Sequence, residues 1–134
     1  MSIRLLLQIM NIQEKNRIEY QSRINRVMDY IDQHLDQPLE LKAIADIANF
    51  SPFHFHRVFT FLIGETPIDY IQRLRIEKAA WKLRETEPQA ITEIAYECGF
   101  GSVSLFSRTF KKYFGMTPIQ EIFWYDTQPI QLGG

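Results

Sequence analysis

Residues 44–67 read IADIANFSPFHFHRVFTFLIGETP, and residues 94–118 read IAYECGFGSVSLFSRTFKKYFGMTP. The two stretches are copies of one pattern. Ile44-Ala45 and Phe50 recur fifty positions later, and the matches that follow recur fifty-one positions later, at Ser102, Arg108, Phe110, Gly115 and Thr117-Pro118-Ile119. One residue is therefore inserted near Gly101 in the second copy. This repeat predicts a chain built from one structural unit used twice.

The first copy reads as a helix, a tight turn and a second helix. Apolar residues at 41, 44, 45 and 48 follow the i, i+3, i+4, i+7 spacing of a helix with one buried face. Asn49 to Pro52 then breaks the spacing. Ser51 is the expected N-cap of the second helix, Pro52 fits its first position, and Gly64 is expected to end it.

The second copy has the same signals. Ile94, Ala95 and Cys98 are expected to face inward, and Gly99-Phe100-Gly101 forms the turn. Ser102 is the expected cap of a helix that stops at Gly115. Two helices joined by so short a turn predict a helix-turn-helix unit.

Three further helices complete the prediction. One covers residues 16–35, and a long one opens at Thr66-Pro67-Ile68-Asp69, runs to about residue 86 and is closed by Glu87-Pro88. Thr117 to Gln120 resembles a capping box that opens a short terminal helix. No strand pattern is present, so the predicted fold is all-α, with two helix-turn-helix lobes joined by a long central helix. The expected organisation is an N-terminal extension (1–15), a first lobe (16–65), a linking helix (66–86), a second lobe (87–122) and a tail (123–134).

Charge is distributed unevenly along the chain. The net charge is −1, but residues 47–64 and 98–120 contain no Asp or Glu, where the overall frequency would place roughly five carboxylates. Two acid-free islands suit a module with local nucleic-acid contacts. The single cysteine excludes a disulfide framework, and the apolar start of the chain is too short for a membrane anchor. A cytoplasmic location is expected.

Helical geometry identifies the outer face of each second helix. The direction opposite the apolar stripe holds Phe53, Arg57 and Thr60 in the first unit, flanked by His54 and His56. The equivalent direction in the second unit holds Ser104, Arg108 and Lys111, beside Ser107 and Lys112. Arg can bridge the O6 and N7 atoms of guanine, and Phe53 can contact a thymine methyl group. We therefore expect the two helices to read different bases within one asymmetric site.

These stretches resemble the AraC/XylS family of bacterial transcription regulators. Residues 43–59 are similar to the first helix-turn-helix of that family, and residues 94–100 and 106–118 are similar to its second. The resemblance covers about residues 23–121 and implies a homeodomain-like bundle that places one recognition helix of each lobe in the major groove. By matching position it implies base contacts from Phe53, His56, Arg57, Val103, Ser104, Ser107 and Arg108. Phosphate contacts are assigned to Ser51, His54, Thr60, Ser102, Lys111 and Lys112.

The resemblance also implies partners. Double-stranded promoter DNA is the expected ligand and RNA polymerase an expected partner, with an activating role; no cofactor or metal is expected. The sequence of residues 51–57 resembles a subgroup in which an effector domain similar to gyrase inhibitors follows on the C-terminal side. That domain is not in this sequence, so the resemblance leaves two alternatives: the chain is the DNA-binding part of a longer regulator, or it acts alone like the small stress-response members of the family. The family's terminal helix commonly continues with Tyr and Arg, whereas residues 122–125 here read IFWY.

Other functional classes fit the residues less well. An enzyme is not expected, because no nucleophile, base or metal ligands are grouped in the sequence: His54 and His56 point about 200° apart on one helix, and Cys98 is expected to be an inert core thiol. One alternative is a helical protein-interaction module that uses Phe53, Phe61 and the apolar tail. A small-molecule sensor with an aromatic pocket around Trp81 or Trp124 is another.

Overall fold

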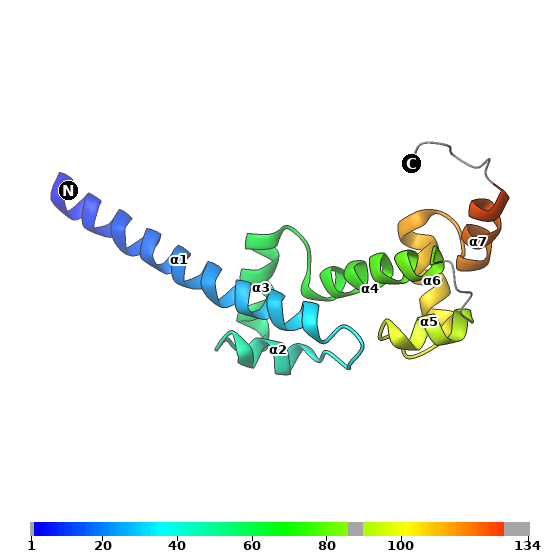
Figure 1. Cartoon of the computed structure of the whole chain (residues 1–134). Coiled ribbons are helices and arrows are strands. Elements are labelled where there is room, and N and C mark those ends of the chain that lie inside the picture. The colour runs from blue at the N-terminus through cyan, green and yellow to red at the C-terminus, as the bar shows by residue number, and fades with distance from the viewer. Residues whose placement is uncertain (1, 86–89, 128–134) are drawn as a thin grey trace. The chain divides into compact units, whose positions relative to one another are not determined.

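A computed structural model describes residues 2–85 and 90–127, and the regular structure within these residues is entirely helical. The elements are α1 (Ile3–Gln33), α2 (Leu41–Ile47), α3 (Pro52–Ile63), α4 (Pro67–Leu83), α5 (Ile91–Glu97), α6 (Val103–Phe114) and α7 (Pro118–Thr127), shown in Figure 1. The expected all-α class is confirmed. The proposed closure of the linking helix at Glu87-Pro88 and the tail from Gln128 onward lie outside the described residues. No helix in the described part has the length and apolar character needed to cross a membrane.

The chain divides into two compact units. Unit 1 consists of residues 1–34 and 39–69, and unit 2 of residues 35–38 and 70–134. Helix α4 begins in unit 1 and continues into unit 2. The short segment Leu35–Pro38 belongs to unit 2 because Arg75 of α4 donates hydrogen bonds to two of its carbonyl oxygens, from Nε to Leu35 (3.0 Å) and from Nη2 to Gln37 (2.7 Å).

The sequence repeat is a structural repeat. Helix α5 starts fifty positions after α2, and α6 starts fifty-one positions after α3. The Ser51 and Ser102 side chains accept hydrogen bonds from the backbone N–H groups of His54 (3.2 Å) and Leu105 (3.1 Å), as N-caps do. Gly64 and Gly115 end the two helices in the left-handed conformation, with φ of 88° and 76°. The extra residue in the second unit therefore lies in the turn and leaves both helices intact.

Both turns close with the same pair of backbone hydrogen bonds. In the first turn the Asn49 and Phe50 N–H groups donate to the carbonyl oxygens of Asp46 (3.0 Å) and Ala45 (3.1 Å). In the second, Gly99 and Phe100 donate to Tyr96 (3.0 Å) and Ala95 (2.9 Å). This is the Schellman motif, which needs a left-handed residue after the helix, here Asn49 (φ 57°) and Gly99 (φ 90°). The following phenylalanine is buried in each case, so the turn is fixed by hydrogen bonding and packing together.

Unit 1 packs α1, α2 and α3 around a small core. Ile24, Val27 and Ile31 of α1 are fully buried, as are Phe55 and Phe59 of α3. Helix α1 begins at Ile3 rather than at Asn16, and Figure 1 shows its N-terminal part running past α2 and α3. No Pro or Gly interrupts the chain between Ser2 and His34, and the Ser2 side chain caps the helix at Leu5 (3.2 Å). The start of the helix was missed because its first turns are exposed and carry no inward-facing pattern.

Unit 2 packs α5 and α6 against the later turns of α4. Its core combines Ile76 and Ala79 with Ile94, Phe106 and Phe110. The expected capping box opens α7: the Gln120 N–H donates to Thr117 Oγ1 (3.2 Å), and the Thr117 N–H donates to Gln120 Oε1 (2.9 Å). Helix α7 is held by Glu121, which is buried and accepts bonds from Arg84 Nε (3.2 Å) and Nη2 (2.7 Å).

Gly99 should be the least replaceable residue of the second turn. A Cβ atom here would lie 2.0 Å from the Leu35 carbonyl oxygen and 2.7 Å from Arg75 Nε, and the positive φ is already unfavourable for other residues. We expect Gly99→Ala to lower the free energy of unfolding of unit 2 by at least about 1–2 kcal/mol, the usual penalty of the left-handed conformation alone. Urea unfolding followed by tryptophan fluorescence measures this, because both tryptophans belong to unit 2.

Gly101 provides the matched control. It has no positive φ, and an added Cβ would meet open space. Gly101→Ala should therefore leave the urea midpoint nearly unchanged. Equal losses for both variants would show that the close approach at Gly99 does not constrain the turn.

Candidate nucleic-acid interface

The candidate recognition helices present the face that the sequence predicted. In α3 the Phe53, His56 and Arg57 side chains are exposed, Phe53 to 74%, while Phe55 and Phe59 are fully buried. In α6 the outer residues Ser104, Arg108 and Lys111 are exposed, while Phe106 and Phe110 are fully buried. Each helix is thus seated by its inner face, which leaves its outer face open to a ligand.

The two arginines occupy equivalent positions with different neighbours. The Arg57 guanidinium lies 5.8 Å from the Phe53 ring centroid, one turn earlier on α3. Arg108 Nε donates to the Ser104 carbonyl oxygen at 3.4 Å, one turn earlier on α6. Phe53 and Ser104 correspond under the fifty-one-residue repeat. Both guanidinium groups therefore lie back toward the start of their helix, over an aromatic ring in one case and a polar backbone group in the other.

The residues assigned to phosphate contacts differ in whether their polar atoms already form hydrogen bonds within the protein. The Thr60 hydroxyl donates to the His56 carbonyl oxygen at 2.7 Å. The Ser51 and Ser102 oxygens accept their cap bonds, but a hydroxyl that accepts retains its own proton to donate. Lys111 and Lys112 are exposed at the end of α6. An exposed lysine acts as a mobile point charge and does not select a particular hydrogen-bonding geometry in its partner.

Two residues assigned to base contacts are less open than the others. Val103 is half-buried and packs against the core of unit 2, and Ser107 is also half-buried. His54, assigned to phosphate, lies edge-on to Tyr20 of α1 (5.9 Å between centroids) and to Phe50 (4.9 Å). These side chains therefore have packing roles whatever else they contact.

A groove between α1 and α3 was not predicted from the sequence. It has a volume of about 1050 Å³, and one wall is formed by Gln13, Asn16, Arg17 and Tyr20 of α1. The other wall includes His54, His56, Arg57 and Thr60, which belong to the predicted DNA-facing set. The i, i+3, i+4, i+7 spacing of the α1 residues was a readable signal. Helical spacing of apolar residues does not reveal this wall, because three of its four residues are polar or charged.

Several observations bear on the enzyme and small-molecule-sensor alternatives, while Phe53 (74% exposed) and Phe61 (87% exposed), named for the protein-interaction alternative, are open to solvent. Burial raises the pKa of the Cys98 thiol, which favours its protonated, unreactive form. Among the described residues no group of three or more His, Cys, Asp or Glu side chains is placed to hold a metal ion. Trp81 is 73% exposed, so it does not form the aromatic pocket considered for a small-molecule sensor. The side chain of Trp124 is not among those that the structure describes.

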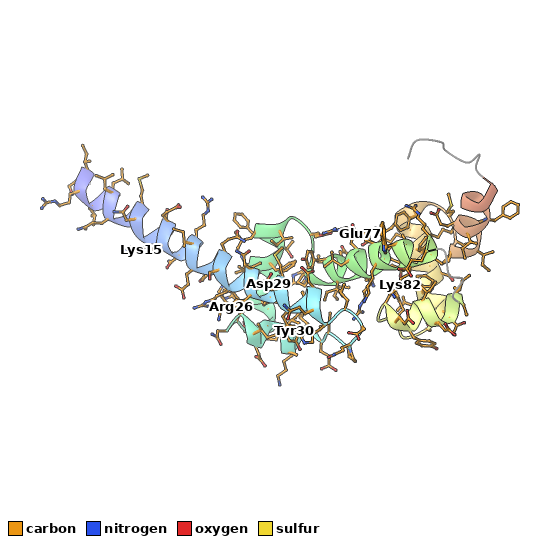
Figure 2. The ribbon with its side chains drawn as sticks, viewed as in Figure 1. Lys15, Arg26, Asp29, Tyr30, Glu77 and Lys82 are labelled. Carbon is orange, nitrogen blue, oxygen red and sulfur yellow. The ribbon has the colours of Figure 1, made fainter. Side chains whose placement is uncertain are left out.

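Lys82 on α4, labelled in Figure 2, forms an ion pair with Glu97 of α5 at 3.1 Å.

Comparisons with known proteins agree with this geometry. A family model described as a helix-turn-helix domain matches residues 44–121. The chain is 36% identical over 101 residues to the regulatory protein SoxS of Escherichia coli K12, covering 75% of the chain and 94% of SoxS. It is 35% identical over 97 residues to the transcriptional activator RhaS of Enterobacter sp. strain 638, covering 72% of the chain but only 34% of RhaS. The DNA-binding domain of AdpA, a global transcriptional factor solved with a target DNA, has a TM-score of 0.75 at 26% identity, over 81% of this chain and 97% of that one.

The buried Cys98 thiol allows a test of whether the protein has a reactive cysteine. We expect Cys98 of the native chain to react with a thiol-specific disulfide reagent roughly a hundredfold more slowly than in urea, because reagent access requires opening of the core. Absorbance of the released thiolate at pH 8 measures the rate, and the unfolded chain supplies the reference of one thiol per molecule. Reaction of the native protein as fast as the unfolded one would show an accessible, activated cysteine.

Proposed function

The chain belongs to the AraC family of helix-turn-helix DNA-binding transcription regulators, and we propose that it reads an asymmetric promoter site with α3 and α6. One observation carries this proposal. Arg57 and Arg108 lie at the same position on two helices that share the same caps and the same buried face. Since an isolated exposed arginine is usually only a solvated charge, the recurrence at one structural position is what favours base reading.

The difference between the two outer faces supports an asymmetric site. Phe53 beside Arg57 offers an apolar contact for a thymine methyl group next to a guanine contact. Ser104 beside Arg108 offers a small hydroxyl, which pairs with several base edges. Lys111 and Lys112 on α6 have no counterpart of like charge on α3, where Thr60 and Phe61 stand. The second helix is therefore the one expected to depend more on phosphate contacts.

One chain is proposed to span two successive major grooves. Their centres are separated by roughly 34 Å on one side of the duplex. A helix of the length of α4, 17 residues, extends about 26 Å at 1.5 Å per residue, which suits a spacer between two reading helices. Under this proposal a monomer binds a specific site, and dimerisation is not required.

The regulatory output is proposed by analogy with the relatives. RhaS is an activator, and the chain spans about a third of its length. We infer that this protein acts in the cytoplasm as an activator that brings promoter DNA together with RNA polymerase. The comparisons give no support to the alternative of a protein-interaction module that lacks DNA binding.

Selection from random duplexes tests the reading function directly. The full chain should enrich one asymmetric site that contains two short boxes about one helical turn apart. Binding that is salt-sensitive but enriches no sequence would contradict base reading by α3 and α6. Absence of binding even at low salt would contradict DNA recognition altogether.

Replacing one of the two arginines should weaken base discrimination in only one of the two boxes. Arg57→Ala should remove discrimination at a guanine of one box, and Arg108→Ala at a guanine of the other, each by about 1–3 kcal/mol. Competition binding with single-base variants of the selected site measures this. Arg26→Ala is the matched control, since Arg26 is exposed on α1 (Figure 2) and lies outside both recognition helices. Relaxation of both boxes by either variant would contradict the assignment of one box to each helix.

Lys111→Ala should act differently. Loss of a phosphate contact weakens binding to all sequences and reduces the slope of log K against log salt by about 0.9. Titrations at several salt concentrations, on the selected site and on an unrelated duplex, measure both effects. A change in the preferred base without a change in slope would place Lys111 among the base readers instead.

A further inference from the structure

The groove between α1 and α3 is continuous with the proposed reading surface. It shares Arg57, His56 and Thr60 with the outer side of α3. A duplex that docks on these residues must pass beside the opposite wall, which is formed by α1. The groove therefore places a second helix at the edge of the proposed DNA site, and none of the functions considered so far uses that helix.

The α1 wall has the chemistry of a phosphate site. It is formed by one cationic side chain, Arg17, two amides, Gln13 and Asn16, and the ring of Tyr20. Arginine, asparagine, glutamine and tyrosine side chains all donate hydrogen bonds to phosphate oxygens. None of the eleven described residues that line the groove is Asp or Glu. No carboxylate therefore lines the groove itself, although the Glu14 carboxylate lies beside the wall, 3.9 Å from Arg17.

Arg17 is available for such a contact, whereas the next arginine on the helix is not. Arg17 is 74% exposed, and its ion pair with Glu14 is long, at 3.9 Å. Arg23 is paired with Glu19 at 2.6 Å and lies 4.9 Å above the Phe50 ring. Arg23 thus serves the fold of unit 1. Arg17 lies three residues before Tyr20 and forms no comparably close contact.

The position of Arg17 relative to α3 is fixed by aromatic packing. Tyr20 meets Phe50 edge-on at 5.1 Å and His54 at 5.9 Å, which ties this turn of α1 to the turn before α3 and to the first turn of α3. A side chain one turn before Tyr20 is carried on the same rigid helix. The backbone of Arg17 is therefore held beside the reading helix before DNA arrives, while its exposed side chain is left to reach a phosphate.

We propose that Arg17, with Gln13 and Asn16, forms a phosphate-binding wall that grips the DNA backbone next to the box read by α3. This inference rests on the proposed function and extends its footprint beyond the two recognition helices. The wall contributes affinity and orientation without sequence preference, because phosphates are the same at every base pair. Its occupant is one strand of the promoter DNA, immediately outside the first box.

The test compares two cations on the same helix. Lys15 is exposed, stands two residues from Arg17 and does not line the groove (Figure 2). Salt titrations of the full chain on its selected duplex should show that Arg17→Ala reduces the slope of log K against log salt by about 0.9, while Lys15→Ala leaves it nearly unchanged. The selected sequence should be the same for both variants. Thermal unfolding by circular dichroism checks that each variant is folded.

A shortened duplex locates the contact. When the DNA ends at the outer edge of the first box, the flanking phosphates are missing, and wild type and Arg17→Ala should bind equally. Equal slopes for Arg17→Ala and Lys15→Ala on the long duplex would overturn the inference and leave the reading function intact. Persistence of the Arg17 effect on the short duplex would overturn the placement of the wall. Failure of the wild type to select any sequence would overturn the proposed function, and this inference with it.

Discussion

The structure depends on the pair of hydrogen bonds that closes each turn. In both units the second residue after the short helix adopts the left-handed conformation, and the following phenylalanine N–H donates to an alanine carbonyl oxygen five residues earlier. This geometry fixes the angle at which α3 leaves α2 and α6 leaves α5. The buried phenylalanine that follows also stabilises the turn by packing. What a recognition helix presents to the outside depends on that angle, because the helix itself is short and capped at both ends.

The left-handed residue of this turn has different surroundings in the two units. The first uses Asn49, whose side chain tolerates a positive φ, and it is exposed. The second uses Gly99, against which the Leu35 carbonyl oxygen and Arg75 approach too closely for any side chain. Arg75 also holds the Leu35–Pro38 segment. In unit 2 the left-handed residue is therefore part of a larger packed contact, whereas in unit 1 that residue is exposed and the packing is made by Phe50 against Tyr20 and His54.

Most of the fold was predictable from local signals in the sequence. Ser51, Pro52, Gly64 and their counterparts mark helix ends by backbone chemistry, and these signals do not depend on the rest of the chain. The start of α1 was not predictable in this way, because its first turns make no core contact that would impose a pattern. The outer faces followed from helical geometry, but the groove did not. It is formed by two helices distant in sequence, and its α1 wall is polar, so an apolar periodicity could not reveal it.

The construction of α3 and α6 has a consequence for how such a protein changes over evolutionary time. Each helix is capped at its ends by its own serine and glycine and is seated by its own buried phenylalanines, which point away from the outer face. Under the proposed base contacts, substitutions at Phe53, Arg57, Ser104 or Arg108 are therefore expected to alter the binding preference with little effect on folding. The base sequence of one half of a promoter site can then change while contacts to the other half keep the regulator bound. A lineage can thus acquire new target genes in small steps and retain a working intermediate at each of them.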